Sequence, residues 1–194
     1  SGTELPSNIQ FRCYSGYLYT TGDVSYCETS TNHGTAVSEL ITDVAPDIEL
    51  YISNPMISRG VFKEAVEWMV SEGVDVINHS GKWVWDGPGD GTSLDSYSPL
   101  VTVEYATSND VLWVNSAGNE NGNTWTGSFG IGPTSGFHYF EPFYNYNSVY
   151  VARNKNVVIQ LRWEDSWLSP SSDLNLYLFD PTLSTYVDRS IDLQ

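Results

Sequence analysis

Positive charge is scarce in this sequence of 194 residues. It holds 8 lysine and arginine residues against 24 aspartate and glutamate residues, so its formal net charge is −16. Proteins that bind nucleic acid or anionic membranes do so through clustered cations that neutralise phosphate groups. Eight scattered cations cannot form such a patch, and the composition therefore argues against both partners. It suits a secreted or salt-tolerant protein.

Long apolar runs are missing as well. No stretch approaches the ~20 apolar residues that a membrane-spanning helix needs. No signal peptide is recognisable, and the sequence begins at Ser1 without a methionine. We therefore expect the chain to be a processed or excised piece of a longer protein.

Cysteine is almost absent, with only Cys13 and Cys27 in the chain. Both lie in an irregular, turn-rich segment, which favours a disulfide that closes a short loop. Such a loop is worth roughly 3 kcal/mol of stability in an oxidising compartment. In a reducing compartment the two residues would be unrelated thiols. We favour the disulfide and an extracellular location.

What is present indicates a folded α/β protein. Hydrophobic residues make up 40% of the chain and aromatic residues 14%, which is typical of a globular protein. The length allows one domain, with or without a small appendage. Apolar spacing predicts helices over 34–44, 61–73 and 99–110, alternating with strands over 48–52, 74–80 and 111–115. This alternation predicts a parallel sheet with helices on both faces.

The helix over 61–73 shows the clearest pattern. Its expected buried face consists of Val61, Phe62, Ala65, Val66, Met69 and Val70, and Gly73 ends it. In the helix over 99–110, Ser98 is the expected N-cap and Pro99 lies in the first turn.

The pattern changes near residue 120, where β alternation interrupted by Pro, Ser, Asp and Asn begins. We expect about four antiparallel strands between 148 and 190, forming a small β-sandwich-like segment. The boundary is expected between 136 and 146, which gives domains over 1–140 and 141–194.

Three stretches carry the chemistry: "NHGTAVSEL" (32–40), "VDVINHSGKW" (74–83) and "VNSAGNENG" (114–122). In type, order and spacing they resemble the histidine, substrate-binding and oxyanion motifs of the subtilisin-like serine peptidases. The resemblance covers roughly residues 30–125 and implies the parallel subtilisin-like sheet of that family. It also implies peptide or protein substrates and acyl transfer to a serine nucleophile.

The resemblance implies a role for each matching residue. His33 corresponds to the general base, and the side-chain amide of Asn119 corresponds to the donor that stabilises the tetrahedral oxyanion. Ala117 and Gly118 would line the specificity pocket. The backbone of Ser80 and Gly81 would pair with an extended substrate. After Ser80 the sequence reads Gly81-Lys82-Trp83, where the family usually has an apolar residue and then a glycine, so Lys82 and Trp83 depart from the expected edge of the pocket.

The two other members of a Ser-His-Asp triad are not found. Asp23 is the only aspartate before His33, but no Asp-Ser/Thr-Gly motif surrounds it. Ser93 lies in "GTSLDSYSP" (91–99), which imitates the nucleophile motif but precedes Asn119 and has Asp95 where alanine is expected. We interpret Ser93 as a false match. The expected explanation is truncation at both ends.

The leading hypothesis is therefore a fragment of a secreted subtilisin-like endopeptidase that is inactive as this chain. Such a fragment would leave core uncovered, and would self-associate or pair with its missing segments. The alternatives are a non-catalytic pseudo-peptidase or surface module that binds protein, and a glycan-binding β-domain using Trp125, Trp163 or Trp167.

Other polar residues receive structural interpretations. His79 is expected to be a strand residue beside the cleft, and His138 a loop residue. No cofactor is required. Calcium is an open option, with Asp165, Asp173 and Asp180 as the candidate ligands.

Overall fold

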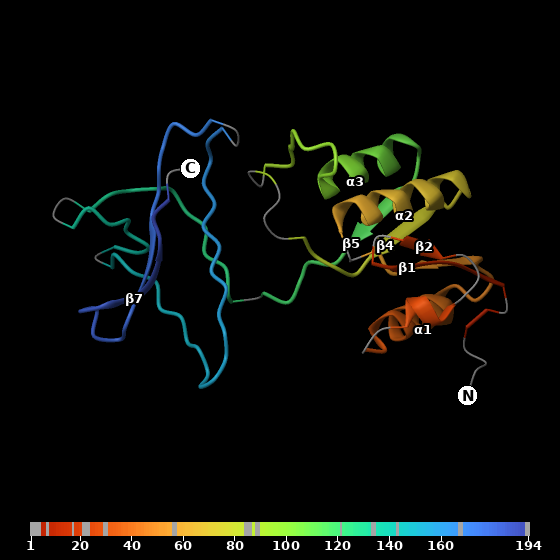
Figure 1. The fold of residues 1–194 in the computed structure, drawn as a ribbon, viewed down its shortest axis with the longest axis horizontal. Coiled ribbons are helices and arrows are strands. Elements are labelled where there is room, and N and C mark those ends of the chain that lie inside the picture. Colours follow the sequence, from red (N-terminus) through yellow and green to blue (C-terminus); the bar gives the residue numbers. More distant parts are fainter. Residues whose placement is uncertain are drawn as a thin grey trace. The chain divides into compact units, whose positions relative to one another are not determined.

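The chain divides into two compact units, each described by itself. Unit 1 comprises Ser1–Ser116 and Glu164–Ser171, and unit 2 comprises Ala117–Trp163 and Ser172–Gln194. Figure 1 shows the computed structural model as a ribbon. It describes residues 5–6, 8–16, 18–20, 24–28, 31–55, 58–83, 87, 90–120, 122–132, 135–142, 144–166 and 169–192.

The helices and strands of unit 1 follow the sequence pattern closely. The helices are α1 (His33–Val44), α2 (Arg59–Ser71) and α3 (Pro99–Ser108), with a short 3-10 helix, η1 (Val24–Cys27). The strands are β1 (Ile9–Ser15), β2 (Leu18–Thr20), β3 (Leu50–Ser53), β4 (Val76–His79) and β5 (Leu112–Asn115). The predicted α-helices and the predicted strands over 48–52, 74–80 and 111–115 are confirmed to within a few residues.

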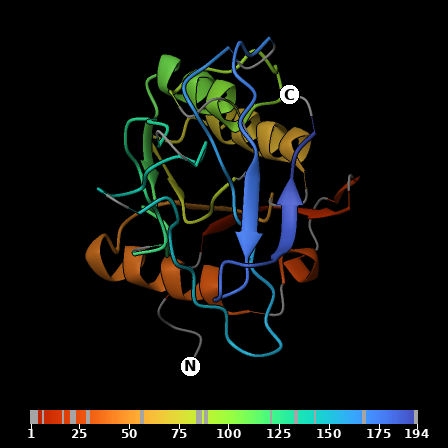
Figure 2. The same cartoon turned by 90° about the vertical axis from the view of Figure 1, so that its left-hand side faces the viewer.

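The strands of unit 1 form small sheets. β1 pairs with β3 in parallel, β4 pairs with β5 in parallel, and β2 adds to the edge of β1 as an antiparallel hairpin. Figures 1 and 2 agree that α1 lies on one side of these strands while α2 and α3 lie on the other. The arrangement is mixed α/β with helices on both faces. The expectation of one parallel sheet holds only in part, because among the described residues the β1–β3 and β4–β5 pairs are separate sheets.

The main core of unit 1 lies between α2, α3 and the β4–β5 pair. Its buried members are Phe62, Val66, Ile77, Ala106 and Val111, with Met69, Val70, Val74, Trp83 and Trp113 packed around them. A second cluster joins Val61 and Ala65 of α2 to Tyr14 of β1. The predicted apolar face of α2 is therefore confirmed, since it supplies residues to both clusters.

Capping residues fix where the helices begin. The Ser58 hydroxyl accepts a hydrogen bond from the Val61 N–H at the start of α2. The Ser98 hydroxyl accepts one from the Leu100 N–H at the start of α3, as predicted. Each cap satisfies a backbone donor that has no partner within its own helix.

A disulfide joins Cys13 of β1 to Cys27 of η1, with 4.9 Å between their Cα atoms. Asn54 strengthens the same connection. Its side-chain amide donates to the carbonyl oxygens of Tyr14 and Tyr26, and its Oδ1 accepts from the Tyr14 N–H. The predicted pairing of the two cysteines is present, and it links the N-terminal strand to the segment that leads into α1.

Unit 2 contains far less regular structure than the sequence predicted. Its described strands are β6 (Leu176–Phe179) and β7 (Tyr186–Ser190), which form an antiparallel hairpin. The expectation of four strands between 148 and 190 is wrong for the described residues of that range. Alternation of apolar residues produces a strand only where a partner accepts the backbone hydrogen bonds. Val158 and Leu161 are exposed in a stretch without such pairing.

The two compact units divide close to the point near residue 120 where the sequence pattern changes. The division falls after Ser116, and the short Glu164–Ser171 segment belongs with unit 1. The proposed domain boundary near residue 140 stays a prediction about the sequence.

Candidate active site

His33 is the first residue of α1, where its side chain is exposed. The first turn is closed by the Ala36 N–H, which donates to the Asn32 carbonyl at 3.0 Å. Among the described residues, no hydrogen bond or ion pair engages the imidazole. Asp23, the upstream aspartate considered as its partner, lies outside the described residues. The position leaves both ring nitrogens of His33 accessible to a group outside the described part of the chain.

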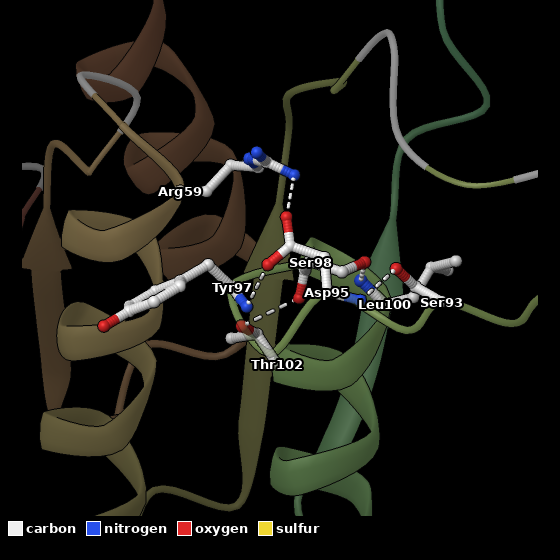
Figure 3. A network of polar contacts seen from close by, with 7 residues as sticks. All are labelled: Arg59, Ser93, Asp95, Tyr97, Ser98, Leu100 and Thr102. Carbon is white, nitrogen blue, oxygen red and sulfur yellow. Dashed lines mark hydrogen bonds and ion pairs between the residues drawn. The ribbon is translucent and has the colours of Figure 1, made fainter. Parts of the chain in front are cut away.

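Ser93 lies in a turn before α3, and Figure 3 shows its surroundings. The Ser93 hydroxyl accepts a hydrogen bond from the Asp95 N–H at 3.2 Å. The Asp95 carboxylate accepts from the Tyr97 N–H at 2.9 Å and forms an ion pair with Arg59 at 2.6 Å. The Ser93 hydroxyl therefore stabilises a turn that Asp95 ties to the start of α2. A nucleophilic serine of this family would instead begin a buried helix.

The same network continues into α3. Ser98 is 0% exposed, and its carbonyl accepts hydrogen bonds from both the N–H and the hydroxyl of Thr102. Nearby, Asp90 closes a tight turn by accepting from the hydroxyl and N–H of Thr92. The Thr92 hydroxyl bond is the main reason that the pKa of Asp90 is lowered. Ser98 therefore holds the first turn of α3, and Asp90 holds a turn in the segment before it.

The substrate-binding motif lies at the carboxyl end of β4. His79 and Asn115 are the last paired residues of the parallel β4–β5 ladder. The ladder extends one step further, because the Ser116 N–H donates to the His79 carbonyl at 3.1 Å. Just beyond, the Asn78 side chain donates to the Ser80 hydroxyl at 3.0 Å. Ser80 and Gly81 therefore leave the sheet beside the start of the segment that leads to Asn119.

A side-chain contact that the sequence did not reveal joins these two strand ends. His79 Nδ1 lies 2.7 Å from Asn115 Oδ1, which also receives the Trp113 indole N–H at 3.4 Å. The Asn115 amide group donates to the Ser116 carbonyl, so the Asn115 oxygen is the acceptor and His79 Nδ1 carries the proton. The sequence offered only one indication of this contact, namely that a polar residue ends each of the two strands.

The oxyanion motif belongs to unit 2. Gly118 has φ +84°, a backbone conformation that favours glycine because other residues adopt it only under strain. The Asn119 N–H donates to the Glu120 carboxylate at 2.9 Å. Ala117, Gly118 and Asn119 are all exposed, and His33, Ser80 and Gly81 belong to unit 1. The Glu120 carboxylate therefore fixes the turn that carries Asn119.

Two of the residues considered for calcium, Asp165 and Asp180, accept hydrogen bonds from nearby residues. Asp165 accepts hydrogen bonds from the Ser166 and Ser171 N–H groups, and Asp180 accepts from Thr182 and Ser184 in the β6–β7 turn. The Thr182 hydroxyl is the main cause of the lowered pKa of Asp180. In the described part of the chain, no three His, Cys, Asp or Glu side chains gather as metal ligands. Calcium binding by Asp165, Asp173 and Asp180 remains an untested prediction.

The comparison with known families decides the identity of the chain. The model of the subtilase family matches residues 19–157, well over half of the sequence. The chain belongs to the subtilase family. The matched range contains the three motifs of this subtilase, so the resemblance to that family is confirmed. No curated protein and no solved structure matches the chain.

No described helix of this subtilase combines the length and the apolar character needed to cross a bilayer. The described aromatic side chains of unit 2 include a packed group formed by Trp125, Phe129, His138 and Phe140. His138 thus packs among aromatic rings in an irregular segment, and its Nδ1 lies 3.1 Å from the Gly130 carbonyl.

Proposed function

We propose that this subtilase segment supplies the base and the oxyanion donor of a serine endopeptidase. His33 takes the proton from a serine hydroxyl as it attacks the peptide carbonyl, and then returns it to the leaving amine. The Asn119 amide donates to the tetrahedral oxyanion, a contact that lowers the barrier by about 2.7–4 kcal/mol in enzymes of this kind. Ala117 and Gly118 line the pocket beside the scissile bond.

The observation that supports this proposal best is the family match over residues 19–157, which includes all three motifs in the order of the family. The local structure is compatible with it. His33 begins a helix with its side chain exposed, and Ser80 follows a parallel strand at its carboxyl end. Ligands of parallel sheets bind at that end of the strands. The substrates proposed from the family are peptides or proteins.

We expect no peptide hydrolysis by the 194-residue chain alone. Its described residues give His33 neither a carboxylate partner nor a serine hydroxyl, and the Ser93 hydroxyl is engaged in a turn. A serine-directed fluorophosphonate probe should therefore leave the chain unlabelled, and fluorogenic peptides should stay intact. Labelling or hydrolysis that persists in the chain after Ser93→Ala, and that is lost after His33→Ala, would overturn this expectation.

The gene on both sides of these residues tests the peptidase proposal. An upstream Asp-Ser/Thr-Gly and a downstream Gly-Thr-Ser-x-Ala would complete the triad. The protein that the gene encodes should then hydrolyse peptides, and His33→Ala should lower kcat strongly. If neither motif is present, the peptidase proposal fails.

A second candidate is a non-catalytic subtilase module that binds protein. The exposed His33, with no bonded partner among the described residues, is what favours it. Binding without hydrolysis in the complete gene product would select this candidate. We also propose an extracellular location. The disulfide between Cys13 and Cys27 and the net charge of −16 are compatible with it.

A further inference from the structure

We propose that Phe62, His79 and Trp83 form an aromatic clamp that pre-organises residues 80–82 for an extended peptide. The inference deepens the proposed function, on which its peptide-binding part rests. Residues 80–82 connect two aromatic side chains, His79 before them and Trp83 after them. Both side chains pack on the ring of Phe62 in α2, so the segment is held at each end by the same buried residue.

The first end is held at His79. Its ring centroid lies 5.1 Å from that of Phe62 and 5.8 Å from that of Trp113. Its Nδ1 bonds to Asn115, and its carbonyl accepts from the Ser116 N–H. Because these contacts come from both the helix and the neighbouring strand, the residue before Ser80 has a fixed position and a fixed ring orientation.

The second end is held at Trp83. Its ring centroid lies 5.5 Å from that of Phe62, and its side chain packs against the main core of unit 1. Its indole N–H is buried and has no hydrogen-bond partner in the described part of the chain. Apolar packing, which includes the ring contact with Phe62, therefore holds Trp83, and a phenylalanine at position 83 would preserve that ring contact.

Between the two ends the backbone is open for pairing. The N–H and C=O groups of Ser80 and Gly81 form no backbone hydrogen bond with any other described residue. A short segment fixed at both ends and carrying unpaired backbone groups is a template for strand addition. Since fixing the chain before binding reduces the entropy lost on binding, the clamp raises affinity for an extended peptide. Phe62, His79 and Trp83 are positioning residues here.

The direct test measures backbone order in the 194-residue chain by ¹⁵N relaxation. The order parameter of Gly81 should be about 0.85 in the unmodified protein and in Trp83→Phe. It should fall below about 0.6 in Trp83→Ala. Trp125→Ala, which removes a tryptophan from unit 2, is the matched control and should leave Gly81 unchanged. If Trp83→Ala fails to fold, Trp83→Leu replaces it. A Gly81 that is mobile in the unmodified protein, or equally ordered in Trp83→Ala, overturns the clamp.

The peptide-binding role is measured separately. A neutral, acetylated and amidated hexapeptide of alternating Ala, Thr and Val residues should shift the amide signals of Ser80 and Gly81. Its Kd should rise about tenfold in Trp83→Ala and stay within about twofold in Trp83→Phe. If Gly81 is ordered as expected but the peptide shifts neither signal, the peptide-binding role fails while the clamp stands. This separates failure of the proposed function from failure of the clamp.

Discussion

Replacing Phe62 with alanine tests the central packing of unit 1 most directly. Phe62 is 2% exposed, and its ring contacts those of His79, Trp83 and Trp113 at 5.1, 5.5 and 5.9 Å between centroids. Truncating a phenylalanine at such a site costs about 3–5 kcal/mol, because the transfer free energy of the ring is lost and a cavity remains. Three aromatic contacts disappear together, which favours the upper part of that range.

Urea unfolding followed by circular dichroism measures this loss. With a urea dependence of about 2 kcal/mol per molar, the midpoint should fall by about 1.5–2.5 M. Phe62→Leu keeps part of the side-chain volume, so its urea midpoint should lie between those of the unmodified protein and Phe62→Ala. Phe11→Ala is the matched control, because Phe11 is 36% exposed on β1 and less of its ring is buried. Phe11→Ala should lower the free energy of unfolding by less than half as much as Phe62→Ala. Equal losses for both alanine variants would refute the assignment of Phe62 to the core.

Two further predictions concern covalent and ionic contacts. Reducing the Cys13–Cys27 disulfide, whose residues lie 14 positions apart, should remove about 3 kcal/mol of stability. Thermal unfolding with and without reductant measures this loss of stability. In the variant with both Cys13→Ser and Cys27→Ser, the unfolding temperature should not change with reductant. The pKa of Asp180 is lowered in the folded protein, so its ionised carboxylate stabilises the turn at pH values above the ordinary pKa of 3.8. This contribution is lost as the pH falls through the lower folded-state pKa. The amide NMR signals of Thr182 and Ser184 should shift with that titration, and the shift should be absent in Asp180→Asn.

Much of unit 1 could be predicted from the sequence because its signals are local. The spacing of Phe62, Val66 and their neighbours indicated the buried face of α2, and Ser98 and Pro99 marked the start of α3. The residues that end β4 and β5 were also identified, because short apolar runs between helices indicate buried strands. The family motifs added His33, Ser80 and Asn119 as candidates. In the structure His33 begins α1, Ser80 follows β4, and the Asn119 N–H donates to Glu120.

The contacts between strand ends could not be predicted. His79 and Asn115 are 36 positions apart, and nothing in either residue indicates that a parallel register would pair them. Ser93 shows the opposite case, in which a suggestive motif proved to be part of a turn network with Asp95 and Arg59 (Figure 3). Of the about four strands expected between 148 and 190, the described residues form β6 and β7, and the others failed for a related reason. An alternating pattern of apolar residues indicates which face of a strand would be buried, but it does not show which other strand would pair with it.

The sequence by itself determined the helices of unit 1 and the family, since each depends on short stretches of residues that are close together in the chain. The roles of His33 and Asn119 as base and oxyanion donor stay predictions from that family. Only the tertiary structure decided that His79 meets Asn115, that Trp83 packs on Phe62, and that no other described residue forms a backbone hydrogen bond with Ser80 or Gly81. These features depend on strand register and on helix packing, which bring together residues that are far apart in the chain. The pre-organisation that we propose for residues 80–82 would therefore be a property of the fold.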